Sequence, residues 1–395
     1  MELVPVKAVG HLQTMKAQLN EEQEERVAQL RKLVKPNLTD YYDTDFNLLR
    51  WLQGHPGSVE SVAEKLNEHL RARSSSWKLD ELWRQPMTHN INVHNELLIE
   101  DLSYVRDNIV VVVDQCGFAD HRGMLQTHSF DEVLLATCYE QEHILHRIME
   151  VEHLTGRQAW VVYVMDLNGL ECSKYLYELT LGPTRCMVDF LCAHYVEIVK
   201  SFVLVNVPPF VNALWTLIRP LLPNRTKQKI QMLSSSNWRE EILKYASADA
   251  LPSTWNLGAD QRFKSELARP FPFEVENFYC NRKEEVPSDC KTVYINAHKS
   301  IIADFELCVG NELSWWITAN MDLAFGVFCS DRKDETNTKK MKVIYPNLVR
   351  LPGPFMVPLK GSITAENNAY YKIYFANPRT SWRPLTVTYS VAVKR

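Results

Sequence analysis

Two apolar runs decide the fold: Trp160-Val-Val-Tyr-Val-Met165 and Phe202-Val-Leu-Val-Asn-Val207. Neither run alternates between polar and apolar residues, which is typical of strands that are buried on both faces of a sheet. A third run of this kind covers residues 109–113. Helical patterns at residues 131–153 and 184–200 lie between the runs, and further helical patterns follow at residues 210–219, 225–233 and 238–246. Buried strands that alternate with helices predict an α/β domain with a parallel sheet at its core.

The segments on either side of this domain have different patterns. Three stretches between residues 21 and 70 carry apolar residues at helical spacing, and Ser58 is placed to cap the third. After residue 285 the period changes to two, as in Phe305, Leu307 and Val309, which predicts an antiparallel β-sandwich. The expected units are a helical unit (1–80), an α/β domain (86–258), a linker (259–285) and a β-sandwich (286–395).

Composition excludes some classes of function. The 395 residues include 44 Lys plus Arg and 48 Asp plus Glu, a net charge of −4, which argues against a general nucleic-acid binder. Nine dispersed cysteines without a C-x-x-C pair are typical of free thiols in a cytosolic protein, and residues 1–10 lack the apolar core of a signal peptide. Residues 201–218 carry no charge, but Pro208 and Pro209 interrupt them, so we interpret them as a buried strand and an apolar helix.

Common catalytic motifs point to no class of enzyme. The sequence contains no G-x-G-x-x-G or G-x-x-x-x-G-K-[ST] phosphate loop, no G-x-S-x-G elbow and no H-E-x-x-H. Asp166 follows a predicted strand, where α/β enzymes often place a carboxylate, but capping of the turn at residues 167–169 explains it as well. We therefore expect a protein that is not an enzyme.

One predicted helix carries candidate metal ligands or acid–base groups on a single face: His143, His146, Glu150 and His153. A straight helix usually supplies only two ligands to one metal ion. A solvated polar face is the alternative, because the same helix carries the further charges Glu140, Glu142, Arg147 and Glu152. We expect no metal at this face and no resident cofactor.

Several segments, in their order along the chain, resemble the CRAL-TRIO lipid-transfer proteins of the yeast phosphatidylinositol-transfer type. These segments are Asp45-Phe-Asn-Leu-Leu-Arg-Trp-Leu52, Trp160-Val-Val-Tyr-Val-Met-Asp-Leu-Asn-Gly-Leu170, Tyr195-Val-Glu197, Leu217-Ile-Arg-Pro-Leu-Leu222 and Trp238-Arg-Glu-Glu-Ile-Leu243. Near the C-terminus, Leu323-Ala-Phe-Gly-Val-Phe328 resembles part of a GOLD domain. The whole chain is similar to the animal group that includes supernatant protein factor.

The resemblance implies a carrier that holds a lipid as cargo in a closed apolar cavity behind a gate helix. The gate and cavity residues would be Phe210, Val211, Leu214, Trp215, Leu217 and Ile218. An ordinary core helix also explains this apolar segment, and the resemblance favours the gate. Basic residues beside the gate would face anionic lipid headgroups, with a solvated basic edge as the alternative: Arg219, Arg225 and Lys227.

The resemblance also points to a headgroup site at Glu197, Thr226 and Lys229. Because Gln53-Gly54-His55 replaces the family's basic residues, fixed charge for a phosphate is reduced there. Phosphatidylinositol or another phospholipid is one candidate ligand, and a sterol- or isoprenoid-type molecule is another. The expected location is cytoplasmic, with transient contact to intracellular membranes. The alternative function is a lipid-sensing adaptor in signalling or vesicle trafficking, with a protein partner on the GOLD-like domain.

Overall fold

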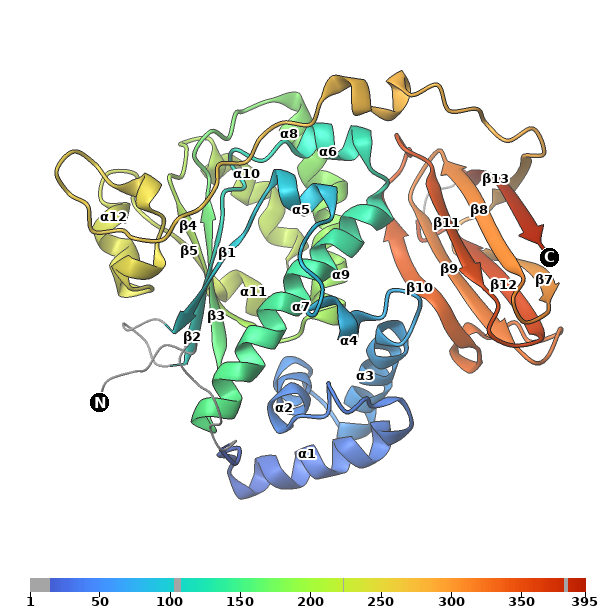
Figure 1. Ribbon diagram of the computed structural model, residues 1–395, viewed down its shortest axis with the longest axis horizontal. Helices are drawn as coiled ribbons and strands as arrows, with labels where there is room; N and C mark the ends of the chain where they lie inside the picture. The colour runs from blue at the N-terminus through green and yellow to red at the C-terminus, as the bar shows by residue number, and fades with distance from the viewer. Residues whose placement is uncertain (1–14, 103–107, 223, 380–382) are drawn as a thin grey trace.

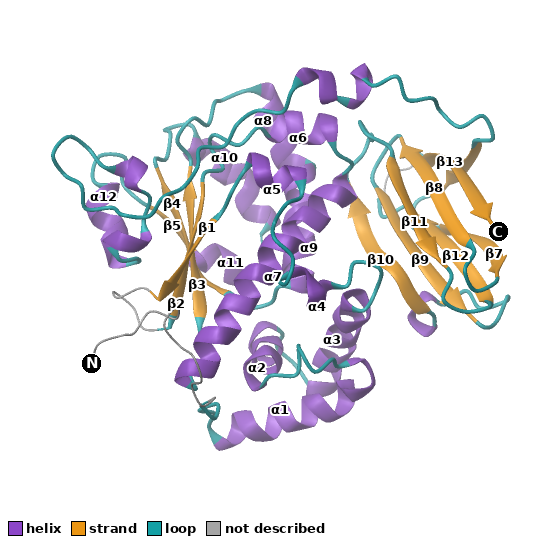
Figure 2. Ribbon diagram, viewed as in Figure 1, coloured by secondary structure: helices purple, strands orange, loops and turns teal. Residues whose placement is uncertain are grey.

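The computed structural model describes residues 15–102, 108–222, 224–379 and 383–395. Helices precede a mixed sheet with helices on both sides, and an antiparallel β-sandwich follows, as predicted (Figure 1). Figure 2 shows the three blocks side by side, with strands of the two β regions separated by helices. Residues 1–10, considered above as a targeting segment, lie outside the described residues.

The N-terminal helical unit consists of α1 (Glu21–Val34), α2 (Asp45–Gly54) and α3 (Val59–Arg73). Side-chain caps start these helices: Asn20 accepts from the backbone N–H of Gln23, and Ser58 accepts from that of Ser61, as predicted. The apolar faces form one buried cluster that also contains Val110 of the sheet. The unit is therefore packed onto the α/β domain. Two short helices, α4 (Leu79–Leu82) and α5 (Asn90–His94), follow.

The central sheet has five strands in the order β1-β2-β3-β4-β5. Strand β1 is antiparallel to β2, and the other neighbours are parallel. The bounds are β1 (Leu98–Leu102), β2 (Ile109–Asp114), β3 (Trp160–Asp166), β4 (Val199–Val205) and β5 (Ile230–Met232). The continuous apolar runs of the sequence thus form the central strands, because both of their faces are covered.

Helices cover both faces of this sheet. Helices α7, α9 and α11 lie on one side and α12 on the other, while α6, α8 and α10 lie toward the top of Figure 1. The bounds are α6 (His121–Thr127), α7 (Phe130–Thr155), α8 (Lys174–Leu181), α9 (Pro183–His194), α10 (Val211–Ile218), α11 (Asn224–Lys229) and α12 (Trp238–Glu241). Short 3₁₀ turns occupy Lys35–Asn37, Arg219–Leu221, Ile242–Lys244, Ala248–Ala250, Ser253–Trp255, Val275–Asn277, Tyr279–Asn281 and Thr338–Lys340.

Two predicted helices end earlier in the structure than their sequence patterns suggest. The helix expected over residues 184–200 ends at His194, because the chain turns at Glu197, whose φ of 53° lies in the left-handed region, and enters β4. The helix expected over residues 225–233 ends at Lys229, because Ile230–Met232 pairs with β4. In both places strand pairing overrides helical propensity.

The expectation that the charges of the long helix α7 face solvent is wrong for two of them. Glu142 is 0% exposed and accepts two hydrogen bonds from Arg73, and Glu152 is 2% exposed and pairs with Arg50. These ion pairs tie α7 to α3 and α2. A buried carboxylate needs such a partner, so the two arginines fix how the helical unit sits on the domain.

The C-terminal sandwich contains two four-stranded sheets, in the orders β10-β9-β12-β7 and β11-β8-β13-β6. All of their neighbouring strands are antiparallel. The bounds are β6 (Lys291–Ile295), β7 (Ser300–Leu307), β8 (Glu312–Ala319), β9 (Leu323–Ser330), β10 (Lys342–Leu351), β11 (Leu359–Thr364), β12 (Ala369–Ala376) and β13 (Leu385–Lys394). Phe305 is only half-buried and Val309 is exposed, so the inward face of β7 ends at Leu307.

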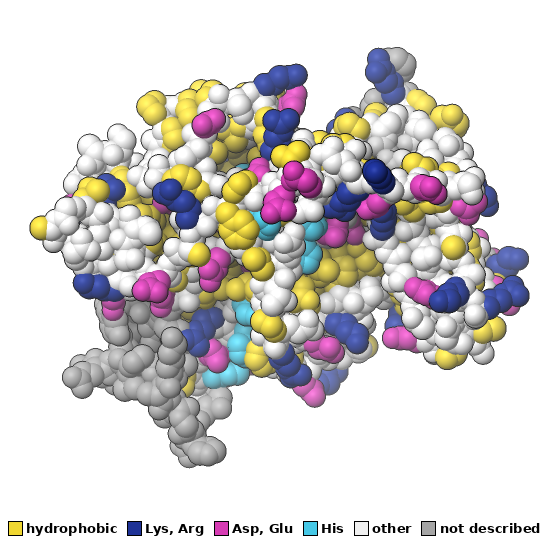
Figure 3. All heavy atoms as spheres, turned by 45° about the horizontal axis from the view of Figure 1, so that its top comes forward, with side chains coloured by type: hydrophobic (Ala, Val, Ile, Leu, Met, Phe, Trp, Pro, Cys, Tyr) yellow, Lys and Arg dark blue, Asp and Glu magenta, His cyan; other side chains and the backbone are white. Residues whose placement is uncertain are grey.

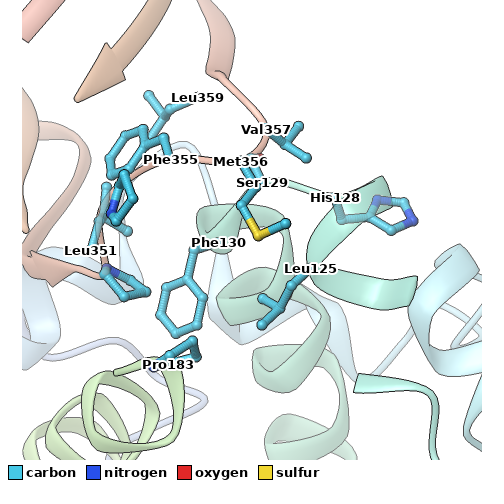
Figure 4. Close-up of a pocket in the computed structure, with 12 residues that line it drawn as sticks. Leu125, His128, Ser129, Phe130, Pro183, Leu351, Phe355, Met356, Val357 and Leu359 are labelled. Atoms are coloured by element: carbon cyan, nitrogen blue, oxygen red, sulfur yellow. The ribbon is translucent and has the colours of Figure 1, made fainter. Parts of the chain in front are cut away.

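The sandwich is packed against the α/β domain through β10. Tyr345 donates to the Asp131 carboxylate at 2.7 Å, and the backbone N–H of Ser76 donates to the carbonyl of Ile344. One hydrophobic cluster contains Leu134 and Phe190 of the α/β domain together with the sandwich core. A pocket of about 70 Å³ remains at this junction, with Phe130 and Pro183 facing Met356 (Figure 4). This volume is much smaller than the roughly 300–1,000 Å³ of a typical ligand pocket.

Residues 201–218 form strand β4, a turn and the eight-residue helix α10, as the proline pair predicts. Among the described residues, no helix combines the length and the apolar character needed to cross a membrane. All nine cysteines are free thiols.

Candidate functional site

One face of the central sheet carries apolar side chains that are incompletely covered. The strand register aligns two rows across β3, β4 and β5: Tyr163, Phe202 and Ile230, and Met165, Leu204 and Met232. Leu204 is 9% exposed and the other five are half-buried. On the opposite face, Val162, Val164 and Val203 are 0% exposed. The side chains of the first face therefore keep solvent-accessible surface; we call this face the apolar trough and the accessible space beside it the hollow.

Helix α10 packs beside the apolar trough but buries little of itself. Val211 is buried in one cluster with Leu204, whereas Leu214, Trp215 and Ile218 are half-buried and Leu217 is 42% exposed. An apolar helix of the core would be covered on all sides. Of the predicted gate and cavity residues, Phe210 and Val211 pack in this cluster, and the later ones keep apolar side chains accessible to solvent.

Glu197 and Lys229, which the resemblance singled out, are brought together. The Lys229 Nζ lies 2.9 Å from Glu197 Oε2 and donates to the Val199 carbonyl at 2.8 Å. The side chains are 11% and 21% exposed, so solvent screens this pair weakly. Glu197 follows α9 and Lys229 ends α11. The pair thus joins the turn before β4 to the end of α11.

Gly54 explains part of the departure from the family's basic residues at positions 53–55. A Cβ at Gly54 would lie 2.1 Å from the Val196 Cγ1 and 3.2 Å from the Glu197 Cγ. No side chain fits there unless the loop moves. His55 remains a weak source of charge, because burial, followed by the charge of Lys65, lowers its pKa.

Arg225 of α11 supplies positive charge beside Glu197. Its Nε lies 3.6 Å from Glu197 Oε1, and its guanidinium donates to the carbonyl of Gln53. The Arg225 side chain is 52% exposed, so it contacts the Glu197–Lys229 pair and still has surface accessible to solvent. Sequence reasoning placed Arg225 with the membrane-facing residues and missed this role. The sequence could have indicated this role only through the lack of space at Gly54. That lack of space comes from Val196 and Glu197, which are distant in sequence.

The remaining predicted residues surround this pair. Thr226 lies next to Cys192: burial raises the pKa of that thiol, and a hydrogen bond with Thr226 lowers it in part. Lys227 contacts the Asn224 side chain at 3.2 Å, and Arg219 is exposed after α10. Glu197, Lys229 and Arg225 therefore form a compact charged group, which we call the headgroup cluster, with Thr226 on the same short helix.

The residues considered for enzyme chemistry have other contacts. Asp166 is 2% exposed; its carboxylate accepts from the Asn206 amide, the Trp255 indole and the backbone N–H of Asn168. The last bond is the predicted turn cap. His146 stacks on Trp83 with ring centroids 3.6 Å apart. Within the described ranges, no three His, Cys, Asp or Glu side chains are grouped to hold a metal ion.

Comparisons with known proteins agree with this architecture. The family model of the CRAL/TRIO domain matches residues 96–258, and that of a domain of unknown function (DUF8435) matches residues 19–82. The CRAL-TRIO domain-containing protein F28H7.8 of Caenorhabditis elegans is 30% identical over 233 residues, 58% of this chain and 56% of that protein. Protein real-time of Anopheles gambiae is 23% identical over 241 residues, 60% of this chain and 35% of that protein.

Among solved structures, the crystal structure of Sfh5 aligns with a TM-score of 0.49 at 14% identity, covering 66% of this chain and 96% of that one. The matches span about half or less of the length of these curated relatives. The sandwich strands at residues 291–394 lie outside both matched models. Proteins of the CRAL/TRIO family are generally lipid-binding or lipid-transfer proteins, and residues 96–258 of this chain form a CRAL/TRIO-like α/β domain.

Proposed function

We propose that this protein binds a hydrophobic lipid in the apolar trough and transfers or presents it between membranes, without enzymatic activity. The observation that carries the proposal is the difference between the two faces of the same sheet. Valines on one face are 0% exposed, while aromatic and methionine side chains on the other stay accessible. A lipid tail would complete the packing of that face. Each CH₂ group removed from water contributes about 0.8 kcal/mol, so two long tails contribute on the order of 20 kcal/mol.

Helix α10 is the proposed gate. Such a lipid leaves through water only slowly, so release requires an opening that faces a bilayer. Tyr177 and Leu181 of α8 and Leu217 of α10 are 40–47% exposed, and Figure 3 shows hydrophobic side chains at the surface on this side of the α/β domain. Arg219 follows directly and supplies about 1 kcal/mol of attraction to an anionic surface. We propose that these residues touch the membrane transiently.

The gate is tested by Leu217→Asp. A carboxylate at this position should hinder insertion of α10 into a bilayer and slow lipid transfer between vesicles about tenfold, while equilibrium loading from one vesicle population stays within about twofold. Asn212→Asp adds the same charge at an exposed position of the same helix and should change the rate little. Equal slowing by both variants would contradict a specific role of Leu217.

The headgroup cluster is proposed to hold a phosphorylated headgroup such as that of phosphatidylinositol. Lys229 and Arg225 share one carboxylate, Glu197, so the cluster carries an excess positive charge. The Thr226 hydroxyl is a further donor. Charge-assisted hydrogen bonds to a phosphate are among the stronger polar contacts.

Lys229→Ala is expected to lower phosphatidylinositol uptake from vesicles about tenfold or more and to leave uptake of an uncharged sterol or tocopherol unchanged. The phosphate would lose a charge-assisted bond worth about 1.5–3 kcal/mol. Lys244→Ala is the matched control, because this lysine is exposed at the end of the 3₁₀ turn after α12 and lies outside the Glu197 pair. If sterol uptake fell in parallel, Lys229 would be maintaining the shape of the hollow instead.

A lipid-sensing adaptor is the second candidate function, with the sandwich as a GOLD-like docking module. One observation favours it: Phe190 of α9, which leads to Glu197, belongs to the same buried cluster as the sandwich core. The transfer assay separates the two functions, because an adaptor would load lipid without moving it between vesicles. In both cases we propose a cytoplasmic protein that visits intracellular membranes.

A further inference from the structure

The end of strand β2 and the middle of α7 place two carboxyl groups at one end of the apolar trough. The register aligns Asp114 with Met165, Leu204 and Met232, so the second apolar row ends at a carboxylate. Tyr163 of the first row donates its hydroxyl to Asp114 Oδ2 at 3.2 Å. Glu140 approaches from α7. Asp114, Tyr163 and Glu140 are all half-buried, so each keeps part of its surface accessible.

This end of the trough is rich in hydrogen-bond acceptors. The Asn92 amide donates to Glu140 Oε1 at 2.7 Å and to the Ala136 carbonyl at 3.1 Å, and the Asn95 amide donates to Asp114 Oδ1 at 3.4 Å. Asn92 is 4% exposed, and within the described residues its Oδ1 and that of Asn95 are buried without a partner. Two carboxyls thus lie beside two asparagines whose amide oxygens lack partners. Buried polar groups normally have partners, so the described part of the chain leaves these amide oxygens short of hydrogen-bond donors.

Within the described residues, little positive charge acts on this site, and His121 is the positive group that lowers the pKa of Asp114. Burial is the main cause that raises the pKa of both carboxyls; the charge of Asp114 raises the pKa of Glu140 further, to about 8. Asn95, His121 and Tyr163 lower the pKa of Asp114 only in part, and a hydrogen bond from Asn92 opposes the shift at Glu140. Two carboxyls that share a low-dielectric site with little counter-charge disfavour a further anion and favour a hydrogen-bond donor or a cation.

We propose that Asp114 and Glu140 form a second polar subsite of the hollow, which binds the hydrogen-bond-donating end of a lipid, a hydroxyl or an ammonium group, and rejects an anionic end. The subsite rests on the proposed function, because the tail of such a ligand would lie along the apolar trough. It stands on different elements from the headgroup cluster: β2 and α7 here, the α9–β4 turn and α11 there. The two ends of the hollow therefore differ in charge, one acidic and one basic.

Three ligands with one tail and different heads test this subsite: oleyl alcohol, oleylamine and oleic acid. The full chain is incubated with each, and bound ligand is measured by native mass spectrometry. The alcohol, the amine or both should bind about tenfold or more tightly than the acid, since a carboxylate head would meet two acidic groups. Asp114→Asn and Glu140→Gln should each bring this preference within about threefold. Glu150→Gln, on the same helix α7 and partly exposed, should leave it unchanged.

The outcomes separate the subsite from the proposed function. If oleic acid binds as tightly as the other two, or if both variants keep the preference, the subsite is wrong while lipid binding stands. If none of the three ligands binds, the proposed function fails with it. Loss of amine binding alone in the variants identifies an ammonium as the preferred head, and equal loss for the alcohol identifies a hydroxyl. Both variants replace a half-buried carboxyl by an amide of nearly the same shape, so thermal unfolding should show them folded.

Discussion

Replacing Arg73 with methionine is expected to lower the free energy of unfolding by about 3–5 kcal/mol. The Arg73 side chain is 1% exposed and lies between two carboxylates, donating to both oxygens of Glu142 at 2.8 and 2.7 Å and to Asp80 at 2.6 Å. Methionine fills similar space but leaves Glu142, which is 0% exposed, as an uncompensated buried charge. Urea unfolding followed by circular dichroism measures the loss.

The double variant Arg73→Met with Glu142→Leu shows whether the loss arises from the orphaned charge. Removing both partners of a buried pair is often close to neutral, so most of the stability should return. Part of the loss should remain, because Tyr195 also donates to Glu142, at 2.9 Å, and would lose this bond.

Arg31 provides the matched control for Arg73. It also bridges two carboxylates, Asp43 and Asp45, but its side chain is 31% exposed. Arg31→Met should therefore cost less than about 1 kcal/mol. Equal losses at Arg31 and Arg73 would refute the argument from burial.

The sequence predicted the central strands well because their signal is local. The runs at residues 109–113 and 160–165 agree with β2 and β3 to within one residue, since both faces of each strand are apolar. Strand β5 escaped prediction because Ile230–Met232 is short and follows a helix-forming segment. Its conformation is set by pairing with β4. The conformation of β5 therefore depends on β4, a segment distant in sequence, and the local sequence pattern does not show it.

In the candidate site, too, some features could be predicted from the sequence and others depend on contacts between distant segments. The resemblance proposed Glu197 and Lys229, 32 residues apart, and the structure places them 2.9 Å apart. The role of Arg225 depends on the loop at Gly54, a contact between residues 172 positions apart. Glu140 was interpreted as part of a solvated face, since helical spacing cannot say which face of α7 docks against the sheet. Helix periodicity identifies faces, and tertiary packing decides which of them is inside.

Met165→Trp is expected to abolish most lipid binding while the protein stays folded. Met165 is half-buried in the apolar trough, beside Asp114 on one strand and Leu204 on another. An indole there can extend into the hollow, so the free energy of unfolding should change by less than about 1 kcal/mol, whereas the affinity for a C18 lipid should fall about tenfold or more as the tail loses its volume. Lipid loading by native mass spectrometry and unfolding in urea give the two readouts.

The neighbouring residue supplies the reciprocal experiment. Val164 precedes Met165 in β3 but points to the opposite face, where it is 0% exposed in a cluster with Trp238 and Trp255. Val164→Trp overpacks a closed core and should destabilise the protein by at least about 1–3 kcal/mol. The same substitution at neighbouring residues of β3 would then have two different effects: Met165→Trp would lower lipid affinity, and Val164→Trp would lower stability. If Met165→Trp destabilised the protein as much as Val164→Trp, the two faces would be packed alike and no hollow would exist for a lipid.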